Sequence, residues 1–365
     1  MVSLTPCRWA ILTGFALAFS SNVARADLLY ANPPEVGSLP IITTAFVNSA
    51  TGDIYQNLYV FSLFDTGSTK VFLDTTTAST LGLQTGNTPI LRLNGLSAID
   101  PVTLDAPIGP GQAQAEFSNI GIKVTGGLDI PLMGAPVTNQ AVATIDYTNT
   151  ITRGPYAYLG GQDVSGPDIT FYSGTNTPGY TPAIELSLDP WGTPLNYPDG
   201  SVSGYWYLMY GVSFTQGSNT VTSASSGDLD STANKFMYDT GTDVTLIVPA
   251  LATSLGLDLN NPDFQLTVGS TPLPGFYLDS ISMAGVGGSY IVTHVPVAVD
   301  SSLGGATAII GSNLFNDTEL LFDGPDNTLG VGVATSQVPE PASAALLLGA
   351  VLTIGLLARR RIGIR

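Results

Sequence analysis

Short apolar runs separated by turn residues recur along most of the chain. Runs of Val, Ile, Leu, Phe and Tyr are divided at short intervals by Gly, Pro, Asn and Asp. Strands bounded by such turn residues are typical of an all-β protein. Two short segments, 75–81 and 249–255, favour a helix instead, and a glycine that can cap the helix follows each of them. The pattern therefore predicts a β-sheet protein with little helix.

Both ends of the chain depart from this pattern. Near the start, Arg8 precedes a short apolar stretch and Ala24-Arg25-Ala26, which predicts a signal peptide over residues 1–26. Near the end, seventeen uncharged residues, 342–358, precede three arginines. This run is marginal for a membrane span, and the arginines would hold its end on the cytoplasmic side. A buried core helix is the weaker interpretation, because basic residues follow the run immediately.

The C-terminal segment also resembles a known sorting signal. Val338-Pro339-Glu340-Pro341, the hydrophobic run and the arginine cluster stand in the order of the PEP-CTERM signals of Gram-negative bacteria. The resemblance covers residues 338–365. It implies export, a membrane-bound C-terminal helix before processing by an exosortase-type enzyme, and delivery to the cell surface, outer envelope or extracellular matrix.

Charge and composition narrow the chemistry of the remaining part, residues 27–338. It has five basic residues against 27 acidic ones, a net charge of −22, which makes nucleic acid an implausible partner. The only cysteine, Cys7, lies in the predicted signal peptide, which leaves no disulfide, thiol nucleophile or cysteine metal site. Because His294 is the only histidine, the usual zinc sites are excluded as well. We expect no metal or other cofactor.

The chain repeats itself at an interval of about 174 residues. Asp65-Thr66-Gly67-Ser68, the first Asp-Thr-Gly loop, matches Asp239-Thr240-Gly241-Thr242, the second Asp-Thr-Gly loop, at an offset of 174. Three further pairs keep the register at offsets of 174, 177 and 177: Leu81-Gly82-Leu83 with Leu255-Gly256-Leu257, Gly134 with Gly311, and Asp146 with Asp323. Four matched landmarks indicate a tandem duplication. The predicted units are an N-terminal lobe with its connection, 27–200, and a C-terminal lobe, 201–337.

Two equivalent loops can form one catalytic site. If the units pack about a pseudo-twofold axis, the loops meet at that axis and bring Asp65 and Asp239 together. Two carboxyl groups a few ångström apart cannot both ionise cheaply, so they share one proton and act as an acid and a base. Such a pair can activate water for attack on a carbonyl and then help the amine leave. Gly67 and Gly241 allow the approach, since a side chain there would keep the loops apart.

The two loops and the motifs that follow them resemble the aspartic proteases of the pepsin type. Each loop is followed, after a long gap, by two apolar residues and a glycine, at Leu132-Met133-Gly134 and Ile309-Ile310-Gly311. Residues 203–214, SGYWYLMYGVSF, also resemble the strand that opens the second pepsin lobe. The resemblance implies two β-barrel-like lobes with a cleft between them. It also implies a monomeric, secreted or surface-anchored endopeptidase that acts on proteins or peptides.

The same resemblance assigns roles to the loop residues. The catalytic pair would be Asp65 and Asp239. The threonine after each aspartate would interlock the two loops by hydrogen bonds, and the hydroxyl three positions after each aspartate would donate to an outer carboxylate oxygen. The supporting residues of the loops are Thr66, Gly67, Ser68, Thr240, Gly241 and Thr242.

The sequence departs from pepsin where a flap would cover the cleft. No tyrosine occurs between Tyr59 and Tyr147, so the flap tyrosine typical of pepsin is missing. Two glycine-rich segments, 108–112 and 282–292, are candidate flaps, and the second resembles the flap of retroviral proteases, which are dimers of one such unit. A plain hairpin turn is the alternative for both segments. The glycines concerned are Gly109, Gly111, Gly285, Gly287 and Gly288.

Two other interpretations stay open. The loops could be ordinary turns without chemistry, which the register of the repeat disfavours. Alternatively, the fold is kept and catalysis is lost, as in a pepsin-like surface or extracellular-matrix binding protein. The intact loops disfavour this second interpretation, whereas the missing flap tyrosine and the anchoring tail favour it. Trp191 and Trp206 are interpreted as core or interface packing rather than as a carbohydrate-binding surface.

Overall fold

The computed structural model describes most of the chain between residues 38 and 334. The described ranges are 38–47, 54–83, 90–93, 96–99, 114–117, 120–126, 128, 130–156, 162–172, 181–192, 205–227, 233–268 and 271–334. The predicted signal peptide, Gly109, Gly111 and the C-terminal tail lie outside these residues. The described part is mostly β-sheet with few and short helices, which confirms the all-β prediction. Within it, no helix has the length and apolar character that crossing a membrane requires.

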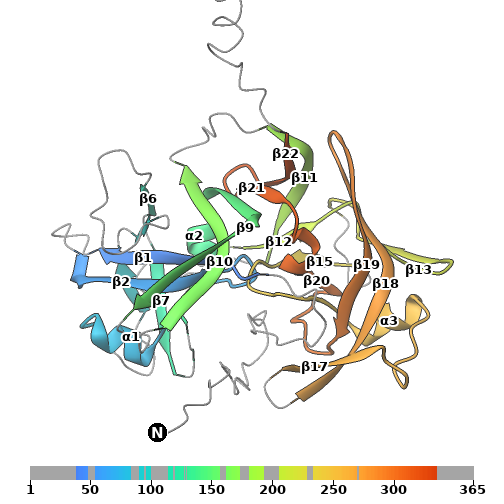
Figure 1. Ribbon diagram of the computed structural model, residues 1–365, viewed down its shortest axis with the longest axis horizontal. Coiled ribbons are helices and arrows are strands. Elements are labelled where there is room, and N and C mark those ends of the chain that lie inside the picture. The colour runs from blue at the N-terminus through green and yellow to red at the C-terminus, as the bar shows by residue number, and fades with distance from the viewer. Residues whose placement is uncertain are drawn as a thin grey trace, which may run out of the picture.

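The strands form two sheets (Figure 1). The first sheet has the order β4-β7-β3-β8-β2-β1-β5-β6. Its strands are β1 (Ile41–Val47), β2 (Ile54–Phe64), β3 (Val71–Asp74), β4 (Ile90–Leu93), β5 (Leu96–Ile99), β6 (Gln114–Phe117), β7 (Ile120–Thr125) and β8 (Leu132–Met133).

The second sheet has the order β10-β9-β21-β22-β11-β12-β15-β20-β16-β19-β18-β13-β14, with β17 paired to β18. Its strands are β9 (Val142–Tyr156), β10 (Gln162–Tyr172), β11 (Thr181–Trp191), β12 (Trp206–Met209), β13 (Val212–Gln216), β14 (Asn219–Thr222), β15 (Phe236–Tyr238), β16 (Thr245–Ile247), β17 (Phe264–Val268), β18 (Thr271–Gly285), β19 (Gly288–Val299), β20 (Ala308–Ile310), β21 (Glu319–Asp323) and β22 (Thr328–Ala334).

The helices of the described part are short. They are α1 (Thr75–Thr80), α2 (Ala135–Thr138), α3 (Pro249–Ser254) and the 3₁₀ helix η2 (Ser312–Phe315). Helices α1 and α3 are the two that the sequence predicts. The carboxylate of Asp74 caps α1 by accepting hydrogen bonds from the backbone N–H groups of Thr76 and Thr77, both at 2.8 Å. Gly82 and Gly256 follow α1 and α3 with φ of +72° and +81°, the left-handed conformation that favours glycine at this position.

The strand pairing repeats the duplication of the sequence. In the first unit, β8 lies between β2, to which it is parallel, and β3, to which it is antiparallel. In the second unit, β20 lies between β15 and β16 in the same way. Strands β2 and β15 lead into the two Asp-Thr-Gly loops, and β3 and β16 follow them. Each loop therefore connects the two neighbours of the short strand that carries the later apolar-apolar-glycine motif.

The division between the sheets falls between β8 and β9, earlier in the chain than residue 200. Strands β9, β10 and β11, which the sequence assigns to the N-terminal lobe, pair within the second sheet: β9 with β10 and β21, and β11 with β12 and β22. Strand β10 also packs on the first sheet, where Phe171 meets Phe64 and Phe117 edge to face at centroid distances of 5.7 and 5.9 Å. Strand β10 therefore connects the second sheet to the first.

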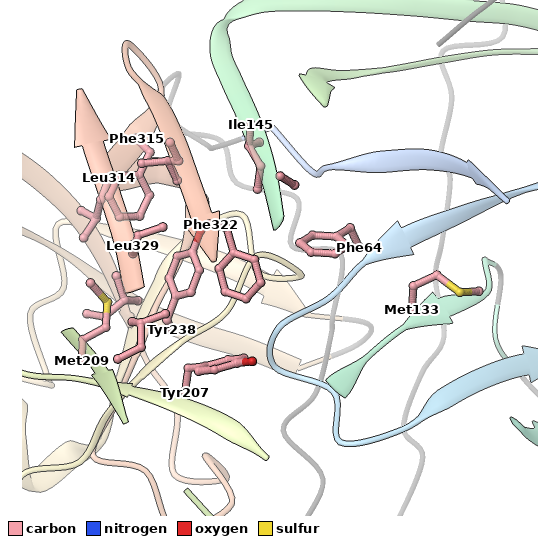
Figure 2. Packing of buried hydrophobic residues seen from close by; sticks show 14 of the residues in the cluster. Phe64, Met133, Ile145, Tyr207, Met209, Tyr238, Leu314, Phe315, Phe322 and Leu329 are labelled. Atoms are coloured by element: carbon pink, nitrogen blue, oxygen red, sulfur yellow. The ribbon is translucent and has the colours of Figure 1, made fainter. Parts of the chain in front are cut away.

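One apolar core connects the strands that carry the two loops (Figure 2). Phe64, the last residue before the first Asp-Thr-Gly loop, meets Phe322 edge to face at a centroid distance of 5.8 Å. Phe322 in turn meets Tyr207 at 5.4 Å and Tyr238 at 6.3 Å, and Tyr238 is the last residue before the second loop. All four rings are buried. Since aromatic pairs favour such geometries, this core holds the two strand ends close together.

Candidate active site

Each Asp-Thr-Gly loop begins at a strand end and is held by equivalent backbone hydrogen bonds. The N–H of Asp65 donates to the carbonyl of Met133 at 3.2 Å, and the N–H of Asp239 donates to the carbonyl of Ile310 at 3.1 Å. Each acceptor is the second apolar residue of the motif that recurs after the loop. The duplicated motifs thus place each aspartate at the end of its central strand.

The glycine of each later motif packs directly against the loop. A Cβ on Gly134 would clash with the carbonyl of Ser68, and a Cβ on Gly311 would lie 2.9 Å from the carbonyl oxygen of Thr242. The residue after each glycine donates its N–H to the same carbonyl, at 2.7 Å in the first unit and 2.8 Å in the second. Glycine is required at both positions because the backbones approach too closely for a side chain.

The two threonines join the loops to each other. The N–H of Thr66 donates to Oγ1 of Thr240 at 3.0 Å, and the N–H of Thr240 donates to Oγ1 of Thr66 at 2.9 Å. Each hydroxyl then donates to the strand that precedes the other loop, Thr66 to the carbonyl of Tyr238 at 3.1 Å and Thr240 to that of Phe64 at 2.5 Å. All these groups are buried, so separating the loops would leave four costly unpaired donors.

The structure brings Asp65 and Asp239 together across the two glycines. A Cβ on Gly67 would overlap the carboxyl group of Asp239. A Cβ on Gly241 would lie 2.8 Å from Cγ of Asp65 and 3.1 Å from Oδ1 of Asp239. Both aspartates have 0% of their surface exposed. The two carboxyl groups therefore share one buried space in which only glycine fits beside them.

The carboxylate of Asp239 is well supplied with donors. Its Oδ1 accepts from the N–H of Gly241 at 2.7 Å, and its Oδ2 accepts from the hydroxyl of Thr242 at 2.9 Å. Hydrogen bonds of this kind stabilise the charged form of a carboxyl group. This is the arrangement that the resemblance to aspartic proteases implies for the second loop.

The carboxyl group of Asp65 has fewer donors. Its Oδ1 accepts from the N–H of Gly67 at 2.9 Å, whereas its Oδ2 is buried and receives no hydrogen bond from the described residues. Ser68, the counterpart of Thr242, donates its hydroxyl to the carbonyl of Lys70 at 2.9 Å instead. The two halves of the site are therefore unequal, although their backbones match.

This inequality decides which carboxyl group favours the proton. Burial raises the pKa of Asp65 well above its ordinary value, and the charge of Asp239 and the contact with its side chain raise it further, whereas the neighbouring N–H groups of Gly67 and Ser68 lower it. Burial also raises the pKa of Asp239, but the N–H of Gly241 and the hydroxyl of Thr242 lower it. Because two adjacent carboxyl groups do not both ionise, the arrangement favours a proton on Asp65 and a negative charge on Asp239.

The glycines of the second candidate flap, Gly285, Gly287 and Gly288, lie at the turn of the β18–β19 hairpin. This turn is bonded to β11: the N–H of Glu185 donates to the carbonyl of Val286 at 2.8 Å, and the N–H of Val286 donates back at 2.9 Å. A side chain on Gly285 would clash with the carbonyl of Glu185. The hairpin turn is thus fastened to β11, another strand of the second sheet.

Two features of the site were not predicted from the sequence, one at Trp206 and one at Tyr147. The indole N–H of Trp206 donates to the carbonyl of Gly67 at 2.7 Å, although packing was the only role expected of this tryptophan. The hydroxyl of Tyr147 is buried without a hydrogen-bond partner among the described residues, and both burial and the charge of Asp239 raise its pKa. Neither residue belongs to the repeated motifs that relate the two Asp-Thr-Gly loops, so the repeat does not point to them. The one available signal for Trp206 is its place in the segment that resembles a pepsin strand.

The described residues offer little for other chemistries. Among them, no three His, Cys, Asp or Glu side chains gather where they could hold a metal ion. The exposed ring of His294 stacks on Tyr277 with a centroid distance of 4.4 Å. No protein-family model matches the chain, and no curated protein matches it either. The two Asp-Thr-Gly loops are therefore the feature of the described residues that points to a function.

Proposed function

We propose that this protein is an aspartic endopeptidase of the two-lobed pepsin type, which hydrolyses peptide bonds with a water molecule activated by Asp65 and Asp239. The observation that carries the proposal is the meeting of two duplicated Asp-Thr-Gly loops, joined by reciprocal hydrogen bonds between Thr66 and Thr240. Two buried carboxyl groups that share a proton supply an acid and a base at the same pH.

In the proposed reaction, Asp239 is the base and Asp65 is the acid. Asp239 takes a proton from the water as its oxygen attacks the peptide carbonyl carbon, while the proton of Asp65 passes to the carbonyl oxygen. Collapse of the resulting tetrahedral diol breaks the C–N bond. The amine leaves with the proton from Asp239, and a diol hydroxyl returns a proton to Asp65. The donors at Gly241 and Thr242 suit Asp239 to the role of base.

Access to the buried pair and export of the protein complete the proposed function. Both carboxyl groups are buried, so the molecule must open before a peptide reaches them. The segments 1–26 and 338–365 support export, passage through the membrane and processing by an exosortase-type enzyme. We place the enzyme at the cell surface, outer envelope or extracellular matrix, acting as a monomer on protein or peptide substrates.

Peptide release from denatured casein, followed by mass spectrometry from acidic to neutral pH, tests this proposal. Asp65→Asn and Asp239→Asn each remove one ionisable carboxyl group at nearly constant size, and each is expected to lower the rate by about 10²–10⁴-fold. Asp258→Asn, which neutralises an exposed aspartate, is the matched control.

The outcomes separate the two functions under consideration. Activity that survives both substitutions would refute the assigned pair. A folded but inactive wild type would favour the alternative, a surface or matrix binding protein that keeps the fold without catalysis.

A further inference from the structure

We propose that Trp206 is a positioning residue for the first Asp-Thr-Gly loop, and that it acts on the reaction through Gly67. This inference rests on the proposed function, because positioning matters only if the carboxyl pair is catalytic. Trp206 lies 139 residues from Gly67 in the chain, and its indole N–H donates to the Gly67 carbonyl at 2.7 Å in a buried hydrogen bond.

Gly67 is the backbone element that lies between the two carboxyl groups. Its N–H donates to Oδ1 of Asp65 at 2.9 Å, and the same N–H lowers the pKa of Asp239. Its Cα also faces the carboxyl group of Asp239 so closely that no Cβ fits. A rotation of this residue would therefore change the environment of both carboxyl groups at once.

Trp206 is itself held firmly in place. It is 6% exposed, and its ring lies against that of Trp191 at a centroid distance of 5.2 Å. The two tryptophans are direct cross-strand partners in the β11–β12 pair. A buried aromatic ring packed against its cross-strand partner is a rigid donor, so the carbonyl of Gly67 has one preferred position.

The strand that carries Trp206 also borders the second aspartate. Strand β12 pairs with β15, where Tyr207 is opposite Tyr238, and Tyr238 directly precedes Asp239. Trp206 thus ties the loop of the first unit to the strand next to the second catalytic aspartate. The hydrogen bonds of the two threonines fix the loops at Thr66 and Thr240. The hydrogen bond from Trp206 fixes Gly67, the residue after Thr66, whose N–H faces the carboxyl pair.

Loss of this bond is expected to affect the chemical step more than substrate binding. Misplacement of a catalytic group by about 1 Å can cost on the order of a hundredfold in rate. A group that acts only by aligning the carboxyl pair changes kcat with little change in KM. Loss of a residue that merely fills space would instead lower the stability of the protein. It would leave the acidic and basic limbs of the plot of kcat/KM against pH in place.

The test compares three variants of the purified protein on one peptide substrate. Trp206→Phe removes the N–H and some volume. Replacement of Trp206 by β-(3-benzothienyl)alanine keeps the shape of the ring but puts sulfur where the N–H was. Phe264→Leu, the control, removes an aromatic ring on β17, a strand that pairs with β18 rather than with β12. The readouts are kcat, KM, the pH limbs of kcat/KM and the thermal unfolding midpoint.

Both changes at Trp206 are expected to lower kcat by about 10- to 100-fold, to leave KM within about twofold and to shift at least one pH limb. Phe264→Leu is expected to keep kcat within about threefold and both limbs in place. Wild-type kcat and pH limbs for the benzothienylalanine variant would overturn the inference. Equal losses in Trp206→Phe and Phe264→Leu would also overturn it.

A readout without catalysis separates this inference from the proposed function. If the wild type does not cleave peptides, the proposed function fails, and the positioning is then judged by unfolding as a function of pH. The Trp206 variants must shift the pH at which stability falls, because Gly67 no longer faces both carboxyl groups in the same way. An unshifted curve would show that Trp206 only packs.

Discussion

Gly67→Ala is the sharpest test of how closely the two loops must approach. A Cβ on Gly67 would lie 2.2 Å from Cγ and from Oδ2 of Asp239, whereas ordinary contact begins near 3.4 Å. The methyl group therefore has to push the loop and the carboxyl group apart by about 1.2 Å. Relaxation is limited, because the neighbouring threonine bonds and the buried core hold both sides.

The cost follows from this displacement. Overpacking of a well-packed site costs about 1–3 kcal/mol of stability, and a shift of about 1 Å in a catalytic group can cost on the order of a hundredfold in rate. We expect both losses for Gly67→Ala. Gly241→Ala is expected to be milder, since its Cβ would lie 2.8 Å from the nearest atoms.

Chemical denaturation and single-substrate kinetics measure the two losses separately. Gly126→Ala is the matched control, because a Cβ there meets nothing within 4 Å. Wild-type stability and rate for Gly67→Ala would show that the carboxyl groups do not meet across this glycine, and the reasoning about the site would fail.

Asp65, Tyr147 and Thr242 each give a further prediction. The raised pKa of Asp65 means that the folded protein binds more protons than the unfolded chain above about pH 3.9, so its stability contribution is full below that pH and is lost as the pH rises through the folded value. In pH-dependent thermal unfolding, Asp65→Asn should flatten this loss and the exposed-site control Asp258→Asn should not; equal slopes would contradict the assignment. Tyr147→Phe should raise the unfolding free energy by about 1 kcal/mol, because it removes a buried unpaired hydroxyl; a decrease measured by denaturant titration would mean that the hydroxyl is bonded. Thr242→Val should move the acid limb of kcat/KM to higher pH more than Ser68→Ala does, because only Thr242 donates its hydroxyl to a carboxylate of the proposed pair; equal shifts would refute the unequal roles.

Much of the fold was predictable where the signal is local or repeated. The all-β character and the helices α1 and α3 follow from short-range patterns, and the glycines at 82 and 256 mark where those helices end. The backbone equivalence of the two loops follows from the duplication, because equal motifs make equal hydrogen bonds to Met133 and Ile310. Local and internally repeated features need no knowledge of the long-range pairing.

The remaining features depend on contacts between distant segments. The Ser68 hydroxyl turns toward Lys70 although its counterpart Thr242 reaches the carboxylate, and the repeat alone suggests equal roles. The attachment of Val286 to Glu185 and the bond from Trp206 to Gly67 each join residues about 100 or more positions apart. The pairing of β9, β10 and β11 in the second sheet is likewise long-range. Because the possible partner strands have similar compositions, their sequences do not show which of them pair.

The pH dependence of kcat/KM for one peptide substrate tests the central claim most directly. A carboxyl pair that shares one proton needs Asp239 charged and Asp65 protonated at the same time. The account therefore predicts a bell-shaped profile on the acidic side of neutrality, with both limbs lost when either aspartate is replaced by asparagine. A rate that rises steadily above neutral pH, or that persists in both asparagine variants, would contradict it.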